Sequence, residues 1–226
     1  VSGEKLEAHL ELLKANGIPA TKRVLFGGEM FIGTGSKQVR VFGVDPETVG
    51  DVFRLRDPKL LAEGSTFVEQ GMREIVVGAW LADDMDIGAG DTVDIRARTR
   101  DGALTTLTLT VAGVLNTENP VINNTAVFMP LSLADEALGM GGEVTDIPMD
   151  FPGWKDIDAE VARVENILSS EYTGLSVQSY VDLFGGGAIM ESKRQVIGVM
   201  LFLVFIIAAV GITNTMMMAV FERIRE

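Results

Sequence analysis

The longest feature in the pattern of hydrophobic and polar positions is an uncharged run near the C-terminus, residues 195–221. As a helix this run would be about 40 Å long, and the apolar core of a bilayer is about 30 Å thick. A core helix in a water-soluble domain usually keeps a polar face, and this run has none. The pattern therefore predicts a transmembrane helix, whose backbone polar groups are all satisfied within the segment.

The second half of this predicted helix differs from the first because it contains small and polar residues. Gly211, Thr215 and Ala219 are spaced by four positions, so they lie along one stripe of a helix. Small residues at this spacing let helix backbones approach closely, and Asn214 can form a hydrogen bond to a neighbouring helix. We therefore expect these four residues to pack against other membrane helices. A single-span anchor that tolerates one asparagine is the alternative.

The first 50 residues read as a helix followed by a hairpin. Leucines spaced three and four apart predict a helix over residues 4–16, which ends at an Asn-Gly pair. Strand-like runs at residues 21–26 and 38–44 flank the turn-forming residues 33–36, which predicts a β-hairpin. An Asp-Pro-Glu sequence at residues 45–47 then predicts the start of a short helix.

Residues 51–140 have a different, β-rich pattern. The segment 53–64 reads as a polar connection, and Asp101-Gly102 is a strong hairpin signal between two alternating runs. Short helices are predicted at residues 79–85 and 132–138. The predicted strands of this stretch are residues 74–77, 92–99, 106–111 and 125–129.

Residues 141–190 return to an α/β pattern. A strand at 143–150, an amphipathic helix at 156–168 and a strand at 175–180 read as a β-α-β unit that pairs with strands from residues 20–44. The predicted fold class is therefore α+β, an α/β subdomain split by a β-rich insertion and followed by one long transmembrane helix. The predicted parts are 1–50 and 141–190 for the split subdomain, 51–140 for the insertion, and 191–226 for the helix and the start of a cytoplasmic segment.

The composition limits the classes of function. The chain has no cysteine, one histidine and a formal net charge of -13. The absence of cysteine excludes disulfides, thiolate zinc sites and thiol nucleophiles. An acidic body repels phosphate backbones, which argues against nucleic-acid binding. The sequence starts without an initiator methionine or signal peptide and stops inside a charged helical pattern, so we expect a segment of a longer protein.

Two stretches resemble ligand sites only superficially. Residues 33–37 (GTGSK) contain glycines and a lysine, but not in the order of a phosphate-binding loop, so a turn is expected. Asp83, Asp84 and Asp86 lack the alternating ligands, central glycine and final glutamate of a calcium loop. We interpret these aspartates as the exposed face of a short helix, and expect no metal site.

The remaining polar candidates also lack a chemical context. His9 lies between Glu7 and Glu11 with no serine or cysteine nucleophile pattern near it, and is expected on a helix surface. Residues 123–125 (NNT) match an N-glycosylation sequon, a match that is common by chance. No catalytic constellation is present in the sequence, so we expect no enzyme chemistry and no cofactor in this segment.

Three stretches together resemble the FtsX-like permease family of ABC transporters with a MacB-like periplasmic core domain. The most specific is GITNTMMMAVFERIRE at residues 211–226, which is similar to the family's small, Asn- and Met-rich helix end before a charged turn. REIVVGAWLADDMDIGAGDTVDI at 73–95, followed by TVAGVL at 110–115, is similar to the family's strand, short helix, Gly-Asp turn and strand. VRVFGVDPE at 39–47 resembles a strand of the core domain.

The resemblance implies an architecture and partners that composition does not provide. It implies that residues 1–190 lie outside the cytoplasm and that the helix crosses the plasma membrane as the second of four. It also implies a dimer with a second permease copy, and an ATPase subunit or domain that holds the ATP and magnesium. In MacB-like members, ATP-driven closure moves the periplasmic domains (mechanotransmission), to export or extract a hydrophobic substrate such as a lipoprotein or peptide. The predicted coupling region toward the ATPase is Glu222, Arg223, Arg225 and Glu226.

One alternative comes from a different class of protein. An acidic ectodomain anchored by a single helix is also typical of a membrane-bound receptor or adhesion module. Further hydrophobic spans before residue 1 and after residue 226 would favour the permease. The substrate, and whether the ATPase is fused or separate, are not specified by this sequence.

Overall fold

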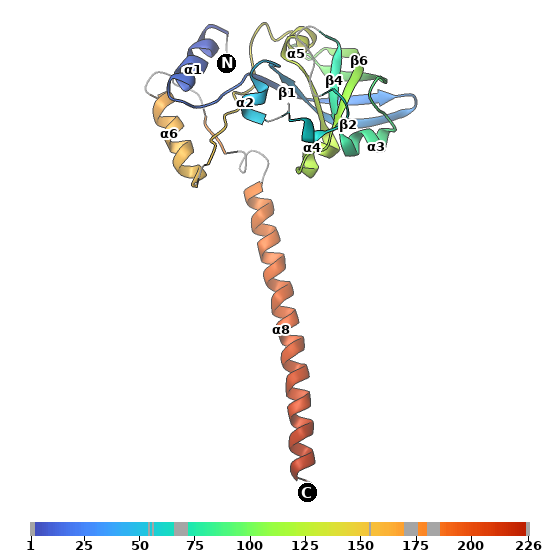
Figure 1. Cartoon of the computed structure of the whole chain (residues 1–226), viewed down its shortest axis with the longest axis vertical. Helices are drawn as coiled ribbons and strands as arrows, with labels where there is room; N and C mark the ends of the chain where they lie inside the picture. The colour runs from blue at the N-terminus through green and yellow to red at the C-terminus, as the bar shows by residue number, and fades with distance from the viewer. Residues whose placement is uncertain are drawn as a thin grey trace. The chain divides into compact units, whose positions relative to one another are not determined.

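The structure, a computed structural model, describes residues 3–53, 55, 57–65, 72–153, 155–169, 176–179 and 186–224. Two compact units make up the chain, unit 1 (Val1–Gly153) and unit 2 (Trp154–Glu226). Unit 1 contains all the strands of the described residues, and unit 2 contains helices α6 (Ile157–Ser169) and α8 (Gly186–Ile224) (Figure 1). A mixed α/β domain with a β-rich core, followed by one long apolar helix that could span a membrane, confirms the α+β class and the C-terminal helix that the sequence predicts.

Unit 1 is built on one seven-stranded sheet in the order β3-β6-β4-β7-β2-β1-β5. β5 also pairs with β6, so the strands other than β3 form a closed ring. Closure satisfies the hydrogen-bonding edges that an open sheet would expose. The strands are β1 (Arg23–Ile32), β2 (Gly35–Val44), β3 (Leu61–Gly64), β4 (Glu74–Gly78), β5 (Thr92–Arg98), β6 (Leu104–Leu115) and β7 (Ala126–Pro130).

Alternation of apolar and polar residues decides which side of each strand faces the inside of the ring. Along β5 every second residue is buried, and these are Val93, Ile95 and Ala97. The opposite residues of β6 follow the same rule, as the sequence predicts. The Asp101-Gly102 hairpin also forms, and Gly102 has a φ of 83°, a conformation that glycine adopts without strain.

Short helices cover the ring. In Figure 1, α5 (Leu131–Leu138) lies above the strands, and α3 (Ala79–Met85) and α4 (Pro120–Thr125) lie below them. α5 approaches β2 closely because Gly43 has no side chain; a Cβ at Gly43 would lie 2.4 Å from the Ala134 Cβ. The outer side of the ring carries a second cluster with Phe42 and Phe128 stacked at 5.1 Å, near α2 (Val49–Phe53). The remaining described helices of unit 1 are α1 (Gly3–Ala15) and the short 3-10 helix η1 (Pro58–Leu60).

Long-range pairing places the predicted hairpin and the predicted insertion in the same sheet. β2 pairs in parallel with β7, with Arg40 opposite Ala126, and β1 pairs antiparallel with β5, with Met30 opposite Ile95. Both pairings join the first 50 residues to the stretch 51–140. The structure therefore has one sheet where the sequence suggested an α/β subdomain interrupted by a separate β-rich one.

Three predicted segments differ from the structure. Part of the connection 53–64 is strand β3, whose Gly64 packs so tightly that a Cβ there would lie 2.2 Å from the Ala112 carbonyl oxygen. The predicted strand 143–150 makes only two isolated bridges, Ala20 to Met149 and Arg23 to Asp146. The predicted strand 175–180 is irregular over residues 176–179, and its two ends lie outside the described residues.

Candidate functional site

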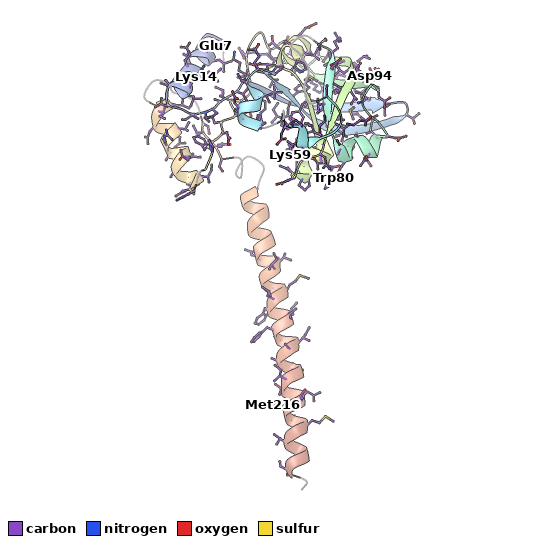
Figure 2. The ribbon with its side chains drawn as sticks, in the orientation of Figure 1. Glu7, Lys14, Lys59, Trp80, Asp94 and Met216 are labelled. Carbon is purple, nitrogen blue, oxygen red and sulfur yellow. The ribbon has the colours of Figure 1, made fainter. Side chains whose placement is uncertain are left out.

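Helix α8 is the candidate site because most of its length is apolar and no other described element covers it. Residues Gln195–Met218 have a mean hydropathy of 2.9, and none of this stretch is buried. At 1.5 Å per residue the 24 residues span about 36 Å, enough to cross an apolar bilayer core of about 30 Å. In Figure 2 the side chains of this stretch, Met216 among them, project from the helix. This exposed surface would be stable against lipid or other apolar helices, and not in water.

The predicted packing residues lie on α8 as the spacing required. The Thr215 hydroxyl donates to the Gly211 carbonyl oxygen at 2.9 Å, so it is satisfied within the helix. A Cβ at Gly211 would meet nothing within 4 Å, which leaves a flat strip of backbone beside Thr215. Ala219 continues the stripe one turn later along the backbone. Whether another helix packs there stays a prediction.

A second face of α8 was not predicted from the sequence. On this face Ala209 and Thr213 form a shallow hollow between bulkier side chains, and Thr213 donates its hydroxyl to the Ala209 carbonyl oxygen at 2.8 Å. At about 100° per residue, the hollow points away from the Gly211 stripe, and Asn214 lies between the two faces. The signal in the sequence is the spacing by three and four positions. The lining residues are Phe202, Phe205, Ile206, Ala209, Val210, Thr213, Asn214 and Met217.

The predicted coupling region is only partly described. Glu222 and Arg223 belong to the backbone of the last turn of α8. Arg225 and Glu226 lie outside the described residues. The role of this region toward an ATPase therefore stays a prediction.

The structure changes one single-residue interpretation, that of His9, and agrees with another, that of Asn123. His9 is 2% exposed, so the prediction that it lies on a helix surface is wrong; it shares the buried side of α1 with Leu6 and Leu13. Its Nδ1 forms a hydrogen bond with the Lys5 carbonyl oxygen. Asn123, the first residue of the N-glycosylation sequon, is also 2% exposed. Its burial agrees with the interpretation that the sequon matches by chance.

The side chain of Asn123 is used for structure. Its Oδ1 accepts from the Thr117 backbone N–H at 2.8 Å and from the Thr117 hydroxyl at 2.9 Å. Its Nδ2 donates to the Thr117 carbonyl oxygen at 2.8 Å and to Asn116 Oδ1 at 3.1 Å. A buried amide with these bonds fixes the connection between β6 and α4, and its nitrogen is not available for a glycan.

The two stretches that resemble ligand sites in the sequence, residues 33–37 and 83–86, have structural roles. Gly33 and Thr34 form the turn between β1 and β2, and the Lys37 ammonium group forms an ion pair with Asp84 on α3. Lys37 also donates to Asn124 Oδ1 at 3.3 Å, so the hairpin tip is joined to both α3 and α4. Asp86 ends α3 in the left-handed conformation. Among the residues that the structure describes, no group of acidic or histidine side chains is arranged to hold a metal ion.

The outer surface of the ring contains an ordered arginine that the sequence did not single out. Arg96 Nη2 donates to Glu29 Oε2 at 2.7 Å, and its guanidinium lies 4.8 Å from the centre of the Phe31 ring. The bond from Arg96, followed by one from Ser36, lowers the pKa of the Glu29 carboxyl below its usual value. Its contacts with Glu29 and Phe31 hold this arginine in place.

Comparisons with known proteins identify a matching domain family and similar solved structures. A family model described as the MacB-like periplasmic core domain matches residues 5–167. The chain resembles the extracellular domain of the noncanonic ABC-type transporter YknZ from Gram-positive bacteria, with a TM-score of 0.53 and 13% identity over 76% of this chain and 85% of that one. It also resembles the periplasmic region of MacB from Actinobacillus actinomycetemcomitans, with a TM-score of 0.48 and 15% identity over 73% and 72% of the two chains. No curated protein matches the sequence.

Proposed function

This chain belongs to the MacB-like periplasmic core domain family, and from that membership we propose that it works as the moving extracytoplasmic part of an ABC transporter permease. In this proposal unit 1 lies outside the cytoplasm and α8 crosses the plasma membrane. ATP hydrolysis on a partner subunit or domain, which holds the ATP and magnesium, moves α8 and with it the extracytoplasmic domain. The substrate class we propose is hydrophobic, such as a lipoprotein or a peptide.

The observation that carries this proposal is the exposed apolar span of α8 in a chain that also contains the family domain. All 24 residues of that span are uncovered by the described parts of the chain. A polar amide within such a span favours a protein neighbour, because an unsatisfied amide in hydrocarbon is unfavourable. We therefore propose that the Gly211 stripe and the hollow around Ala209 are contact surfaces for other membrane helices, including those of a second permease copy.

The proposed role is non-catalytic. The described residues offer a closed β-ring, short covering helices and paired surface charges, an arrangement suited to binding and movement. Glu222, Arg223, Arg225 and Glu226 would lie toward the ATPase. No nucleic-acid partner is proposed for a chain with a net charge of -13.

The proposal is tested with the full-length protein and its ATPase in lipid nanodiscs. The measurement is vanadate-sensitive ATP hydrolysis, compared between the intact protein and a form that lacks residues 1–190. We expect the deletion to change the hydrolysis rate, because a coupled domain alters the cycle that drives it. An unchanged rate, together with the failure of any ATPase to co-purify, would favour a membrane-anchored receptor or adhesion module.

A further inference from the structure

Helices α3 and α4 present two large apolar side chains to solvent. Trp80 on α3 is 49% exposed (Figure 2), and Val121 on α4 is also 49% exposed. Apolar side chains that remain in water at neighbouring positions mark a candidate interaction surface. We call the outward side of these two helices the tryptophan face.

The two helices are packed together where these apolar side chains lie. Gly78, the residue before α3, contacts the backbone of α4, and a Cβ at Gly78 would lie 2.4 Å from the Ile122 carbonyl oxygen. Trp80 is two positions after Gly78, and Val121 is the residue before Ile122. Trp80 and Val121 therefore belong to one surface that is built by both helices.

The tryptophan face has more carboxylates than cations. Asp83 and Asp84 follow Trp80 by three and four positions and are exposed, so they lie on its side of α3. Glu118, two positions before α4, is exposed as well. Lys37 pairs with Asp84, whereas the ion pairs among the described residues include neither Asp83 nor Glu118. Two carboxylates of the face are therefore left without a described counter-charge.

The Trp80 ring offers a place for a cation from outside the chain. The cation–ring contacts of the described residues involve phenylalanines, and none involves Trp80. A cation over a tryptophan ring is attracted by the ring's quadrupole, and a neighbouring carboxylate such as Asp83 adds a charge-assisted hydrogen bond. Helix η1, which packs on the same outer cluster as α4, adds one carboxylate and one ammonium group, from Asp57 and Lys59, and so no net charge.

We propose that the tryptophan face binds a basic segment of a partner protein, with an arginine guanidinium over the Trp80 ring and the Asp83 carboxylate beside it. Charge complementarity supports this occupant, because the face is acidic on a chain with a net charge of -13. Arginine suits both contacts, since its planar guanidinium stacks on aromatic rings and donates paired hydrogen bonds to a carboxylate. Val121 provides an apolar contact for the side chains between the basic ones. The inference goes beyond the proposed function and does not depend on it.

The test uses the full chain in detergent micelles and fluorescently labelled deca-arginine, with binding followed by anisotropy at physiological salt. Decacitrulline, in which an uncharged urea group of similar shape replaces each guanidinium, is the control probe. Trp80→Ala removes the ring, Trp80→Phe keeps a smaller one, and Asp83→Asn removes the carboxylate. Leu104→Ala and Asp101→Asn are the matched controls, since both residues are exposed on the hairpin between β5 and β6, outside the tryptophan face.

We expect binding of deca-arginine to weaken about fivefold in Trp80→Ala and in Asp83→Asn, with Trp80→Phe between Trp80→Ala and the natural chain. Leu104→Ala and Asp101→Asn should bind within about twofold of the natural chain. Asp83→Asn removes no apolar contact, so it keeps the test decisive if Trp80→Ala fails to fold.

The proposal is overturned if deca-arginine does not bind, or if decacitrulline binds as tightly, which would assign the face to an uncharged partner. It is also overturned if Leu104→Ala or Asp101→Asn weakens binding as much as the variants of the face, because binding would then follow the overall charge and apolar surface of the chain. ATP hydrolysis plays no part in this assay, so this proposal and the permease proposal can fail independently.

Discussion

Arg23 and Asp146 are 123 positions apart in the sequence and form a bidentate ion pair: Arg23 Nε donates to Asp146 Oδ1 at 2.9 Å, and Arg23 Nη2 donates to Oδ2. The Arg23 guanidinium also lies 5.6 Å from the ring centres of both Phe42 and Phe53. Backbone hydrogen bonds lie beside this ion pair; in one of them the Thr145 N–H donates to the Arg23 carbonyl oxygen at 3.0 Å. The pair therefore holds the irregular segment around residue 146 against the start of β1.

Replacing Asp146 by Asn should destabilise unit 1. The Arg23 side chain is 10% exposed and would keep its charge without a carboxylate partner, so we expect a loss of about 2 kcal/mol or more in the free energy of unfolding. Urea unfolding followed by tryptophan fluorescence measures this loss. Glu136→Gln, an exposed carboxylate on α5, is the control and should change the free energy by less than about 0.5 kcal/mol. Equal effects of the two variants would contradict a stabilising role for the pair.

Gly43→Ala should be destabilising because α5 leaves no room at this position. The new methyl group would start 2.4 Å from the Ala134 Cβ, so α5 must shift, at a cost of about 1–3 kcal/mol. Gly27→Ala provides the comparison, since its Cβ meets nothing within 4 Å. Adding Ala134→Gly to Gly43→Ala should restore part of the lost stability. No recovery in the double variant, measured by the same urea unfolding, would argue against this contact as the cause.

Asn123→Ala should also destabilise unit 1. The change leaves the partly buried Thr117 backbone groups without the partners that Asn123 supplies, and we expect a loss of about 2–3 kcal/mol. Thermal unfolding of the variant, beside Asn124→Ala at the exposed neighbouring position, measures the difference. A melting temperature equal to that of the Asn124 variant would show that the four bonds add little.

The stability of unit 1 should depend on pH through Glu29. The pKa of Glu29 in the folded chain is lowered by Arg96 and Ser36 from 4.5. A lowered pKa contributes stability that is fully present above the unfolded value near 4.5 and is lost as the pH falls through the folded value. Unfolding of the natural chain and of Glu29→Gln from pH 7 to pH 3 should therefore show a stability difference that shrinks below pH 4.5. A difference that is constant over this range would contradict the linkage.

Asn214→Leu should weaken the association of α8 with other membrane helices. An interhelical hydrogen bond in a bilayer is worth about 1 kcal/mol, so association of the full-length protein should weaken about fivefold. Energy transfer between labelled copies in vesicles measures association. The chain has no cysteine, so labels can be placed at chosen single cysteines. Ile207→Leu keeps the apolar volume and should leave association unchanged; a similar loss in both variants would exclude Asn214 as the polar contact.

Local patterns predicted most elements of unit 1 because their signals are local. The alternation along β5 and the Asp-Gly pair at 101–102 each depend on neighbouring residues, and both were confirmed. Pairing between distant strands has no such signal, which is why the β2–β7 and β1–β5 ladders were not foreseen. Proline at 148 also removes a backbone donor from the predicted strand 143–150, which makes isolated bridges instead.

For the candidate sites too, the sequence predicted local spacing but not contacts between distant residues. The stripe of Gly211 and Thr215 follows from helical spacing alone and lies where expected on α8. The error at His9 could have been avoided, because its distances of three from Leu6 and four from Leu13 place it on their face. The ion pair between Arg23 and Asp146 joins residues 123 positions apart, and one sequence does not show which distant residues meet.

The return of β5 to β6 has a mechanical consequence. A pull that arrives near residue 150 enters unit 1 beside β1, where the Asp150 N–H donates to the Pro19 carbonyl oxygen. From β1 the load divides in two directions, through β2 and through β5, and both routes meet again at β6. Tension would therefore be shared between the strands of this circuit. We expect such a domain to move as a whole instead of unravelling, which the proposed transmission of movement from an ATPase would require.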